Sequence, residues 1–555
     1  MKLSGAEIII KLLEKEGIEV IAGIPGGSSL PMYNALSKSS IKHILARHEQ
    51  GAGFISQGIA RTTGKAAVCF ATSGPGVTNL LTAIADAKLD SVPIIAITGQ
   101  VPYKSMGTDA FQEVDTYGLT VPITKHNFLV RSVEELTYII PKAFEIAETG
   151  RPGPVVIDVP KDIQNQIIEI EISENIGNKD KAINIDIYEI EKIAHAVNKA
   201  KKPLFIIGGG VTNSDSGYLV RDISQKNDIP VAATLMGLGN YPSESSLFIG
   251  MLGMHGEVAT NLIVNEADLV LAFGIRFDDR ATGDIKKFCP NATIVHVDID
   301  SAEIDKLKKS KYSIAGDVKE VLLKLKPFIK VNKREAWKKE IKDIKTKHLM
   351  PEVTLSDDIN NPINLIKVLN GLLDDDTIIT TDVGQHQMWV AQHYNFRRPR
   401  KFITSGGLGT MGFGLPAAIG AAVANQDKKV VCISGDGSFM MNLQELSTLQ
   451  ELNLNVTVII LNNGCLGLVR QQQELFYEGR YIACKFKSKQ DFSLIAAGFG
   501  IKSYCLKNEK DPICTLKKAL LNKEPCVIDV LINENENVLP MVPPGGGNCE
   551  MVGGK

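Results

Sequence analysis

The sequence predicts an α/β protein with three doubly wound parallel-sheet domains. Three observations support this prediction. Helical and strand-like patterns alternate along the chain, the strands are short runs rich in β-branched residues, and they exit into loops of small or polar residues. This alternation is typical of parallel sheets covered by helices, which bind ligands at the carboxyl ends of their strands. A chain of 555 residues has room for about three or four such domains.

The composition argues against several classes of function. The 61 basic and 63 acidic residues nearly cancel, so no polybasic region indicates binding to nucleic acid or to an anionic membrane. Nine cysteines without a CxxC pair fit a reducing compartment better than a disulfide framework or a zinc site. No apolar run approaches the ~20 residues that cross a bilayer. Because the N-terminus leads directly into an amphipathic helix, we expect a soluble, cytoplasmic protein.

Residues 1–165 are expected to form the first domain. The patterns predict helices at 6–16, 30–36 and 78–89, and strands at 20–24, 42–45, 66–71, 93–97 and 155–159. Three strand exits are PGG at 25–27, RHEQ at 47–50 and TSGPG at 72–76. The following stretch, 166–190, loses its apolar periodicity and is expected to be a linker.

The second predicted domain spans residues 191–335, with strands at 204–207, 231–233, 269–273 and 294–297. Its glycine-rich strand exits are GGG at 208–210 and GIRFDDR at 274–280, and simple turns would explain each of them alone. Together with HVDID at 296–300, the exits indicate a dinucleotide lying across the strand ends, and arginines beside aspartates suit a charge-paired ligand. The basic stretch 324–349 is interpreted as a solvated surface helix, and 336–361 as a linker.

The third predicted domain spans residues 362–535 and precedes a Gly/Pro-rich tail, 536–555. Its strand at 430–433 ends at Gly435-Asp436-Gly437, a helix follows at 441–452, and a second strand at 455–461 ends at Asn462-Asn463. Such a crossover places the ends of two parallel strands on one edge, so Asp436 and Asn463 should lie side by side. An ordinary turn would explain a lone GDG. Combined with the terminal NN, it indicates a divalent cation holding phosphate, the motif of thiamine-diphosphate (ThDP) enzymes.

Two other motifs need their alternatives stated. Gly407–Gly412 matches GxGxxG, but it follows only a short strand-like run and lacks the acidic residue of a dinucleotide site. We therefore interpret it as a loop and helix start, with Met411 as an apolar wedge under a bulky ligand. Glu49 of RHEQ would ordinarily be a solvated carboxylate, but it follows a strand where ThDP enzymes place a glutamate against the aminopyrimidine of the cofactor.

Over essentially its whole length the chain resembles the catalytic (large) subunits of the acetohydroxyacid synthases, also called acetolactate synthases. The matching stretches include PGGSSLPMY (25–33), RHEQGAGF (47–54), ATSGPGVTNL (71–80), RPGPVVIDVPKDIQ (151–164), GIRFDDR (274–280), DVGQHQMW (382–389) and SGGLGTMGFGLPAAIGA (405–421). The resemblance implies that the three domains bind the ThDP pyrimidine, FAD, and the diphosphate with Mg²⁺, in that order. The RFDDR-type run favours the biosynthetic branch over the catabolic one, which lacks FAD.

The resemblance also implies roles for individual residues. Glu49 would activate ThDP; Asp436, Asn463 and the backbone carbonyl of Cys465 would hold Mg²⁺; and Met411 would bend the cofactor. Other ThDP contacts would be Gln385, His386, Gly409, Gly435, Gly437, Ser438, Leu466 and Gly467. Gly27, Phe111, Gln112 and Lys161 would come from a neighbouring subunit to line the acceptor side. The FAD contacts would be Arg151, Gly208, Gly209, Gly210, Leu252, Gly253, Met254, His255, Gly274, Arg276, Asp278, Arg280, Asp298, Ile299, Asp317 and Val318.

The implied reaction decarboxylates pyruvate and condenses the two-carbon unit with pyruvate, giving 2-acetolactate, or with 2-oxobutyrate, giving 2-aceto-2-hydroxybutyrate. This is the first common step of branched-chain amino-acid biosynthesis. The implied assembly is a homodimer or dimer of dimers with active sites at the subunit interface, and a small regulatory subunit is a candidate partner. This chain has Gln472 where the family often has tryptophan. The resemblance therefore leaves open how strongly the enzyme prefers 2-oxobutyrate over pyruvate as the second substrate. Pyruvate oxidase and 2-oxo-acid decarboxylase are the alternatives, against which Lys161 and GTDAFQE (107–113) argue. A non-catalytic nucleotide-binding subunit is a further alternative, and the presence of Glu49, Asp436 and Asn463 argues against it.

Overall fold

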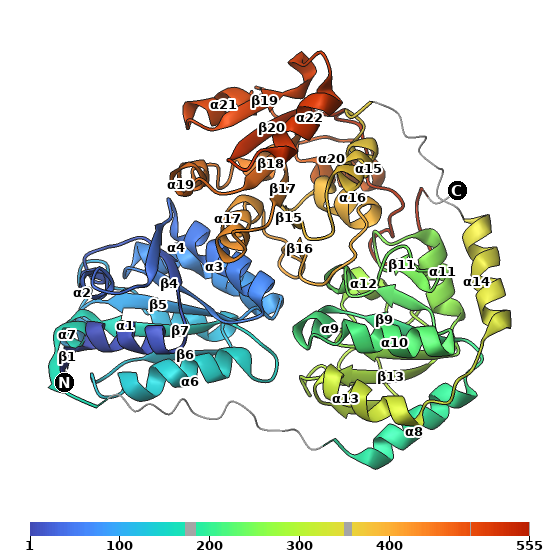
Figure 1. Ribbon diagram of the computed structural model, residues 1–555, viewed down its shortest axis with the longest axis horizontal. Helices are drawn as coiled ribbons and strands as arrows, with labels where there is room; N and C mark the ends of the chain where they lie inside the picture. The colour runs from blue at the N-terminus through green and yellow to red at the C-terminus, as the bar shows by residue number, and fades with distance from the viewer. Residues whose placement is uncertain (172–184, 349–357, 489, 554–555) are drawn as a thin grey trace.

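The computed structural model describes residues 1–171, 185–348, 358–488 and 490–553. It contains three six-stranded sheets, each parallel throughout, which confirms the predicted fold class (Figure 1). No helix in the described part of the chain is long and apolar enough to cross a membrane.

The first domain, blue to cyan in Figure 1, has the strand order β3-β2-β4-β5-β7-β6. A short antiparallel pair, β1 (Lys2–Ser4) and β8 (Ile167–Glu169), joins its two ends. The strands of the sheet are β2 (Val20–Gly23), β3 (Lys42–Leu45), β4 (Ala67–Ala71), β5 (Ile94–Gln100), β6 (His126–Leu129) and β7 (Val155–Pro160). The helices are α1 (Gly5–Lys15), α2 (Leu30–Leu36), α3 (Glu49–Thr63), α4 (Pro75–Leu89), α5 (Thr116–Thr120), α6 (Leu136–Glu148) and α7 (Lys161–Asn165), with 3₁₀ turns η1 (Tyr103–Ser105) and η2 (Val121–Ile123).

The second domain, green in Figure 1, has the order β11-β10-β9-β12-β13-β14. Numbered within the sheet this is 3-2-1-4-5-6, the order of dinucleotide-binding folds. Its strands are β9 (Pro203–Ile207), β10 (Val231–Ala233), β11 (Phe248–Met251), β12 (Leu269–Phe273), β13 (Thr293–Asp298) and β14 (Tyr312–Ala315). The helices are α8 (Ile187–Lys199), α9 (Gly209–Asn213), α10 (Gly217–Asn227), α11 (Val258–Glu266), α12 (Asp279–Thr282), α13 (Val318–Leu325) and α14 (Glu335–Lys347), with η3 (Leu235–Gly237) and η4 (Lys326–Phe328).

The third domain, orange to red, has the order β16-β15-β17-β18-β20-β19. Within its sheet this is 2-1-3-4-6-5, the same order as in the first domain. Its strands are β15 (Ile378–Thr381), β16 (Phe402–Ile403), β17 (Val430–Gly435), β18 (Val456–Asn462), β19 (Lys502–Cys505) and β20 (Cys526–Leu531). The helices are α15 (Pro362–Leu372), α16 (Gln385–His393), α17 (Gly414–Ala424), α18 (Asp436–Phe439), α19 (Glu445–Leu452), α20 (Gly467–Phe476), α21 (Phe492–Gly498) and α22 (Pro512–Leu521), with η5 (Leu506–Asn508).

Successive residues of the central strands enter cores on opposite faces of each sheet. In β4, Val68 and Phe70 pack in one core while Cys69 and Ala71 pack in another, as the alternation of side chains along a strand requires. Both faces are therefore covered, and the central strands are mostly apolar, as expected for a buried parallel sheet.

The first and third domains share one of these cores. α3 packs on α17 within it, and Figure 1 shows the two helices side by side. Their backbones touch: a Cβ on Gly58 would lie 2.1 Å from the carbonyl oxygen of Ala417, and one on Gly420 would lie 1.9 Å from that of Ile55. Glycine is required at both positions, which locks the two domains in register.

The structure corrects several expectations. Strands β6, β11, β14, β19 and β20 are not predicted from the sequence. All except β20 lie at sheet edges, and in β6, β14 and β19 partial exposure weakens the apolar pattern. The predicted linkers contain β8 and most of α14, whereas residues 172–184 and 349–357 lie outside the described part. The basic stretch is not one solvated helix, because it breaks after α13 and buries Trp337 and Ile341 of α14. Trp337 Nε1 donates to the carbonyl of Pro203 at 3.1 Å.

Candidate active site

The predicted metal-binding residues meet at the carboxyl edge of the third sheet. β17 and β18 are parallel neighbours in register, so Asp436 and Asn463 leave the sheet on the same side. Both are buried, and Gly464 donates its backbone N–H to Asp436 Oδ2 at 2.8 Å. Asn463 Oδ1 accepts the backbone N–H of Cys465 at 3.1 Å. Burial raises the pKa of Asp436 to about 6.

Gln385 and His386 begin α16 beside this pair. Gln385 Nε2 donates to Gln471 Oε1 at 2.9 Å and to the carbonyl of Glu536 at 2.7 Å, and its Oε1 accepts from Asn463 Nδ2 at 3.4 Å. His386 is buried, which lowers its pKa to about 3. Its Nε2 has no hydrogen-bond partner among the described residues. A buried nitrogen of this kind is one that a bound ligand can satisfy.

The shape and chemistry of this edge fit a diphosphate with a hard cation. A Cβ on Gly467 would lie 2.0 Å from Gln385 Oε1, and one on Gly437 would lie 2.7 Å from Leu466 Cδ2, so a larger residue at either position would have to displace these side chains. No group of three or more His, Cys, Asp or Glu side chains in the described ranges could hold a metal. One carboxylate with amide and carbonyl oxygens suits Mg²⁺, which keeps water and phosphate oxygens in its shell.

The predicted wedge, Met411, lies in a loop that leads into α17 rather than in a dinucleotide turn. Asp382, at the end of β15, holds this loop by accepting backbone N–H groups from Gly412 at 2.9 Å and Gly414 at 3.1 Å. Met411 is half-buried and Gly409 is exposed. Burial raises the pKa of Asp382 to about 6. Asp382 is thus a further candidate site residue, which the sequence does not single out although it stands at a strand exit like the others.

Glu49 is the first residue of α3, not part of an irregular loop as expected from the sequence. It is buried, and its Oε2 accepts from Asn79 Nδ2 at 3.0 Å. Its Oε1 accepts no hydrogen bond from the described residues and lies near Gly76 of the GPG turn. The carboxylate is therefore held by one oxygen, and the other is available to a ligand.

A second buried carboxylate, Glu445 of α19, holds the turn before Glu49. Its Oε1 accepts the backbone N–H groups of Arg47 at 2.8 Å and His48 at 3.1 Å, and its Oε2 accepts from Thr448 Oγ1 at 2.7 Å. Burial raises its pKa. Nothing in the local sequence identifies Glu445, because the turn that it holds is about 400 residues away in the chain.

The predicted acceptor-side residues gather at the carboxyl edge of the first sheet. Gly27 and Phe111 are exposed, Phe111 to 89 %. Gln112 has φ 62°, and its backbone packs against the GPG turn at Gly74. Lys161 is half-buried at the start of α7. In the third domain, Gln472 lies on the exposed side of α20.

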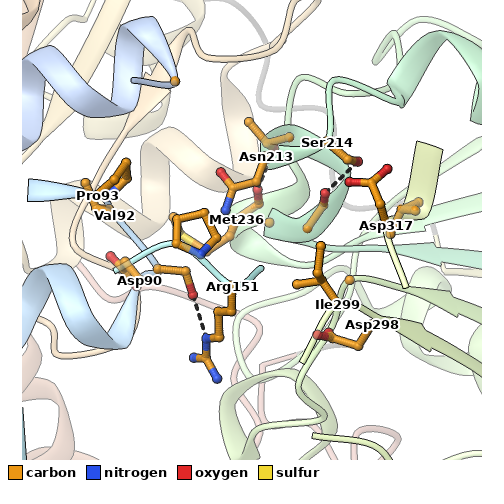
Figure 2. A pocket seen from close by; sticks show the side chains of 18 of the residues that line it. Asp90, Val92, Pro93, Arg151, Asn213, Ser214, Met236, Asp298, Ile299 and Asp317 are labelled. Atoms are coloured by element: carbon orange, nitrogen blue, oxygen red, sulfur yellow. Dashed lines mark hydrogen bonds between the residues drawn. The ribbon is translucent and has the colours of Figure 1, made fainter. Parts of the chain in front are cut away.

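A cavity of about 1130 Å³ opens between the three domains (Figure 2). It lies at the ends of β9 and β12, where the strand order of the second sheet reverses and nucleotides bind in such folds. Arg151 reaches it from the first domain; its Nε donates to Ser91 Oγ at 2.9 Å and its guanidinium pairs with Glu303 at 2.8 Å. The predicted FAD residues that line it are Arg151, Gly209, Gly210, Gly274, Arg276, Asp278, Asp298, Ile299, Asp317 and Val318.

The glycines at this cavity do not all serve the same purpose. A Cβ on Gly210 would lie 2.5 Å from the Cα of Gly274, whose φ is +58°, so these two glycines allow the strand exits to pack backbone to backbone. Gly209, in contrast, has open space apart from Met236 at 3.4 Å. Gly209 is thus the position where a ligand could approach the backbone.

The other predicted FAD residues do not line the cavity: Gly208, Leu252, Gly253, Met254, His255 and Arg280. Met254 N donates to the carbonyl of Arg280 at 2.7 Å, and Val542 of the C-terminal tail donates to the carbonyl of Met254 at 2.8 Å. Burial, and then the nearby Arg280, lower the pKa of His255 to about 4. Gly253, Met254, His255 and Arg280 thus form a separate cluster beside the tail, whereas Gly208 packs against Gly274 at the end of β9.

Comparisons with known families match all three domains. The N-terminal thiamine pyrophosphate (TPP, another name for ThDP) binding domain of thiamine pyrophosphate enzymes matches residues 3–119, the central domain of these enzymes matches 190–325, and their C-terminal TPP binding domain matches 382–530.

Curated proteins also match the chain over almost its whole length. The acetolactate synthase isozyme 1 large subunit of Escherichia coli is 53% identical over 553 residues, which are 100% of this chain and 98% of that protein. The isozyme 2 large subunit of the same organism is 44% identical and covers 99% of both chains. The chloroplastic acetolactate synthase of Arabidopsis thaliana is 45% identical over 98% of this chain and 83% of its own.

Proposed function

Because the chain belongs to the acetolactate synthase large subunits of the thiamine pyrophosphate enzyme family, we propose that Glu49, Asp436 and Asn463 form its catalytic centre. The reaction decarboxylates pyruvate and joins the two-carbon unit to a second 2-oxo acid, within branched-chain amino-acid biosynthesis. The observation that carries this conclusion is 53% identity along the full chain. The pairing of Asp436 with Asn463 at one sheet edge supports it.

ThDP, when bound, supplies a nucleophilic carbon and an electron sink for decarboxylation. Asp436 and Asn463 would hold Mg²⁺ through side-chain oxygens, and Cys465 through its carbonyl. The unpartnered His386 Nε2 and the glycine turns support this placement. Glu49 would hold a proton between its Oε1 and the pyrimidine ring, since Oε2 is occupied by Asn79.

FAD would occupy the cavity between the domains. The 3-2-1-4-5-6 strand order, the volume of about 1130 Å³ and the position of the predicted residues Arg151 and Arg276 in its lining support this proposal. The purified protein should bind FAD, and reduced FAD should still support acetolactate formation because the reaction needs no net redox step. Full activity after verified removal of the flavin would contradict a requirement for it.

The proposed assembly is a homodimer, or a dimer of dimers, whose active sites combine two subunits. Large apolar side chains remain exposed in the first domain, with Phe111 at 89%, and in the third, with Ile482 at 76% and Leu494 at 70%. A second copy of the chain would bury such residues. The relatives named large subunits support a small regulatory subunit as a further partner. Cytoplasmic localisation remains a prediction, and plant relatives are named chloroplastic.

Product analysis tests the assignment directly. The protein is incubated with pyruvate, ThDP, Mg²⁺ and FAD, with and without 2-oxobutyrate, and the products are identified by mass spectrometry. We expect acetolactate in the first case and acetohydroxybutyrate as well in the second. Acetaldehyde as the main product would indicate a decarboxylase, and consumption of oxygen with formation of an acetate derivative would indicate an oxidase. Either outcome would overturn the assignment.

A further inference from the structure

The segment Ser405–Thr410, here called the bridge loop, connects β16 to the turn that carries Met411. It also touches both other domains. A Cβ on Gly406 would lie 2.5 Å from Met236 Sδ of the second domain, and one on Gly407 would lie 3.0 Å from Leu89 of the first. The loop therefore lies at the junction of the three domains, although residues 407–409 are exposed.

Two aspartates hold the bridge loop: Asp86 lies within α4, and Asp90 follows its last residue. Asp90 Oδ2 accepts the backbone N–H of Gly406 at 2.9 Å, and its Oδ1 accepts that of Gly407 at 2.7 Å. Asp86 Oδ1 accepts hydrogen bonds from the Ser405 hydroxyl and, at 2.9 Å, from Thr410 Oγ1. These bonds fix the loop at both its ends.

Arg61 of α3 ties the two aspartates together. Its NH2 donates to Asp86 Oδ2 at 3.2 Å and to Asp90 Oδ2 at 2.8 Å, and the three side chains are almost completely buried, Arg61 to 6% exposure and the aspartates to 0%. Burial, and then the neighbouring Asp90, raise the pKa of Asp86. One guanidinium thus pairs with two carboxylates away from water. Such a group stabilises the loop only while all its hydrogen bonds are made, because an unpaired buried charge is costly.

The same residues form part of the cavity wall. Asp90, Arg61 and Met236 line the cavity together with Arg151, and Figure 2 labels Asp90, Met236 and Arg151 among the lining residues. Arg151 Nε is bonded to Ser91, the residue after Asp90. A ligand that fills the cavity would therefore lie against Arg61 and the backbone of Asp90, directly beside the buried carboxylates that hold the bridge loop.

On this basis we propose that Asp86 and Asp90 are positioning residues that couple the cavity to the Met411 turn, so that a flavin dinucleotide and ThDP strengthen each other's binding. The inference rests on the proposed function, which places FAD in the cavity and ThDP beside Met411. Each ligand would order the same loop, and the second to bind would find it already ordered. By thermodynamic linkage, the factor by which FAD tightens the binding of ThDP must equal the factor by which ThDP tightens the binding of FAD.

The experiment measures this coupling factor in the full-length protein freed of both cofactors. The Kd of ThDP is determined at fixed Mg²⁺ with and without saturating FAD, and the Kd of FAD with and without saturating Mg²⁺ and ThDP. For the wild type we expect about 5- to 150-fold tightening, equal in both titrations. Asp90→Asn and Thr410→Val should reduce the factor towards one while each cofactor still binds alone.

Asp298→Asn is the matched control. Asp298 lines the cavity from the second domain, and its Oδ1 accepts the backbone N–H of Asp300 at 2.9 Å, away from the groups that hold the bridge loop. The substitution should weaken FAD binding but leave the coupling factor at the wild-type value. A variant that only damaged the fold would weaken the binding of both cofactors but leave the coupling factor unchanged.

The outcomes separate this inference from the proposed function. Failure of the wild type to bind FAD or ThDP would contradict the proposed function itself. Binding of both with a coupling factor of one would overturn the coupling while leaving the function intact. A wild-type factor that persists in both Asp90→Asn and Thr410→Val would overturn the role of the aspartates.

Discussion

Glu445 allows the positioning of Glu49 to be tested without touching either the proposed metal site or Glu49 itself. Glu445→Ala removes the acceptor for two backbone N–H groups, those of Arg47 and His48. Leaving each unpaired costs about 1–3 kcal/mol, so a rigid turn would lose about 2–6 kcal/mol. Because this turn is only half-buried, we expect it to relax towards water instead, displacing Glu49. A displacement of about 1 Å can cost on the order of 10²-fold in rate.

The assay separates activation of the cofactor from its binding. We expect Glu445→Ala to slow exchange of the thiazolium C2 proton, followed by NMR in deuterated water, by about 10²-fold, while ThDP affinity measured by calorimetry stays close to wild type. Glu445→Gln keeps an acceptor but loses the charge, which roughly halves the strength of each bond, so its effect should be much smaller.

Ser447→Ala is the control for this experiment, because Ser447 Oγ accepts from the Arg47 side chain at 3.2 and 3.0 Å and leaves the turn backbone bonded to Glu445. Wild-type exchange in Glu445→Ala would refute the reasoning. Equal losses in Ser447→Ala would show that the Arg47 side chain, and not the turn backbone, matters.

Four further predictions follow from individual site residues. Asp436→Ala should abolish ThDP binding at ordinary Mg²⁺ levels, with Asn463→Ala weaker in effect, because only the carboxylate is charged; unchanged calorimetric affinity would contradict the metal site. Glu49→Gln should bind ThDP yet lose C2 exchange and turnover by a factor on the order of 10² or more, and exchange at the wild-type rate would exclude the role. Wild-type enzyme should prefer 2-oxobutyrate over pyruvate only weakly, and Gln472→Trp should prefer it more, within the ~10–200-fold that one methylene allows. The test is competition between equal concentrations of pyruvate and 2-oxobutyrate, and an unchanged product ratio in Gln472→Trp would mean that other residues determine selectivity. Asp158 is buried, which raises its pKa from 3.8 to about 7, so the folded state holds a proton that the unfolded state releases and stability falls as pH rises from about 4 to 7. In Asp158→Asn the fall in the free energy of unfolding over this pH range, measured by urea unfolding, should be smaller by up to roughly 4 kcal/mol. An unchanged dependence of stability on pH would contradict the prediction.

The residues that could be predicted from the sequence are those fixed by local chain geometry. Asp436 and Asn463 each follow an apolar strand, and a crossover between neighbouring strands leaves little choice about where the two exits meet. The 407–412 run could be assigned to a loop because no strand of ordinary length precedes it, and β16 proves to be only Phe402–Ile403. The strand order of the sheets could not be predicted, because edge strands such as β6 and β19 carry too few buried positions to be recognised.

The residues that could not be predicted act across domains. Glu445 bonds to a turn about 400 positions away, and Asp86 bonds to Ser405, more than 300 positions away. No periodicity or spacing relates such positions, because their proximity depends on how complete domains pack. The sequence does carry one chemical indication of such residues. An acidic residue on the buried face of a helix needs a hydrogen-bond or ion-pair partner, because burying an unpaired charge is costly.

α3 connects these two sets of contacts. Its first residue is Glu49, whose turn is held by Glu445, and near its other end Arg61 pairs with the aspartates that hold the bridge loop. A 15-residue helix is a rod of about 22 Å, and the backbone contact at Gly58 fixes it against α17. The turn that presents Glu49 and the loop that leads to Met411 are therefore positioned by one rigid element. A displacement at either end of this helix would therefore move the other end, so the positions of Glu49 and of the loop that leads to Met411 depend on each other.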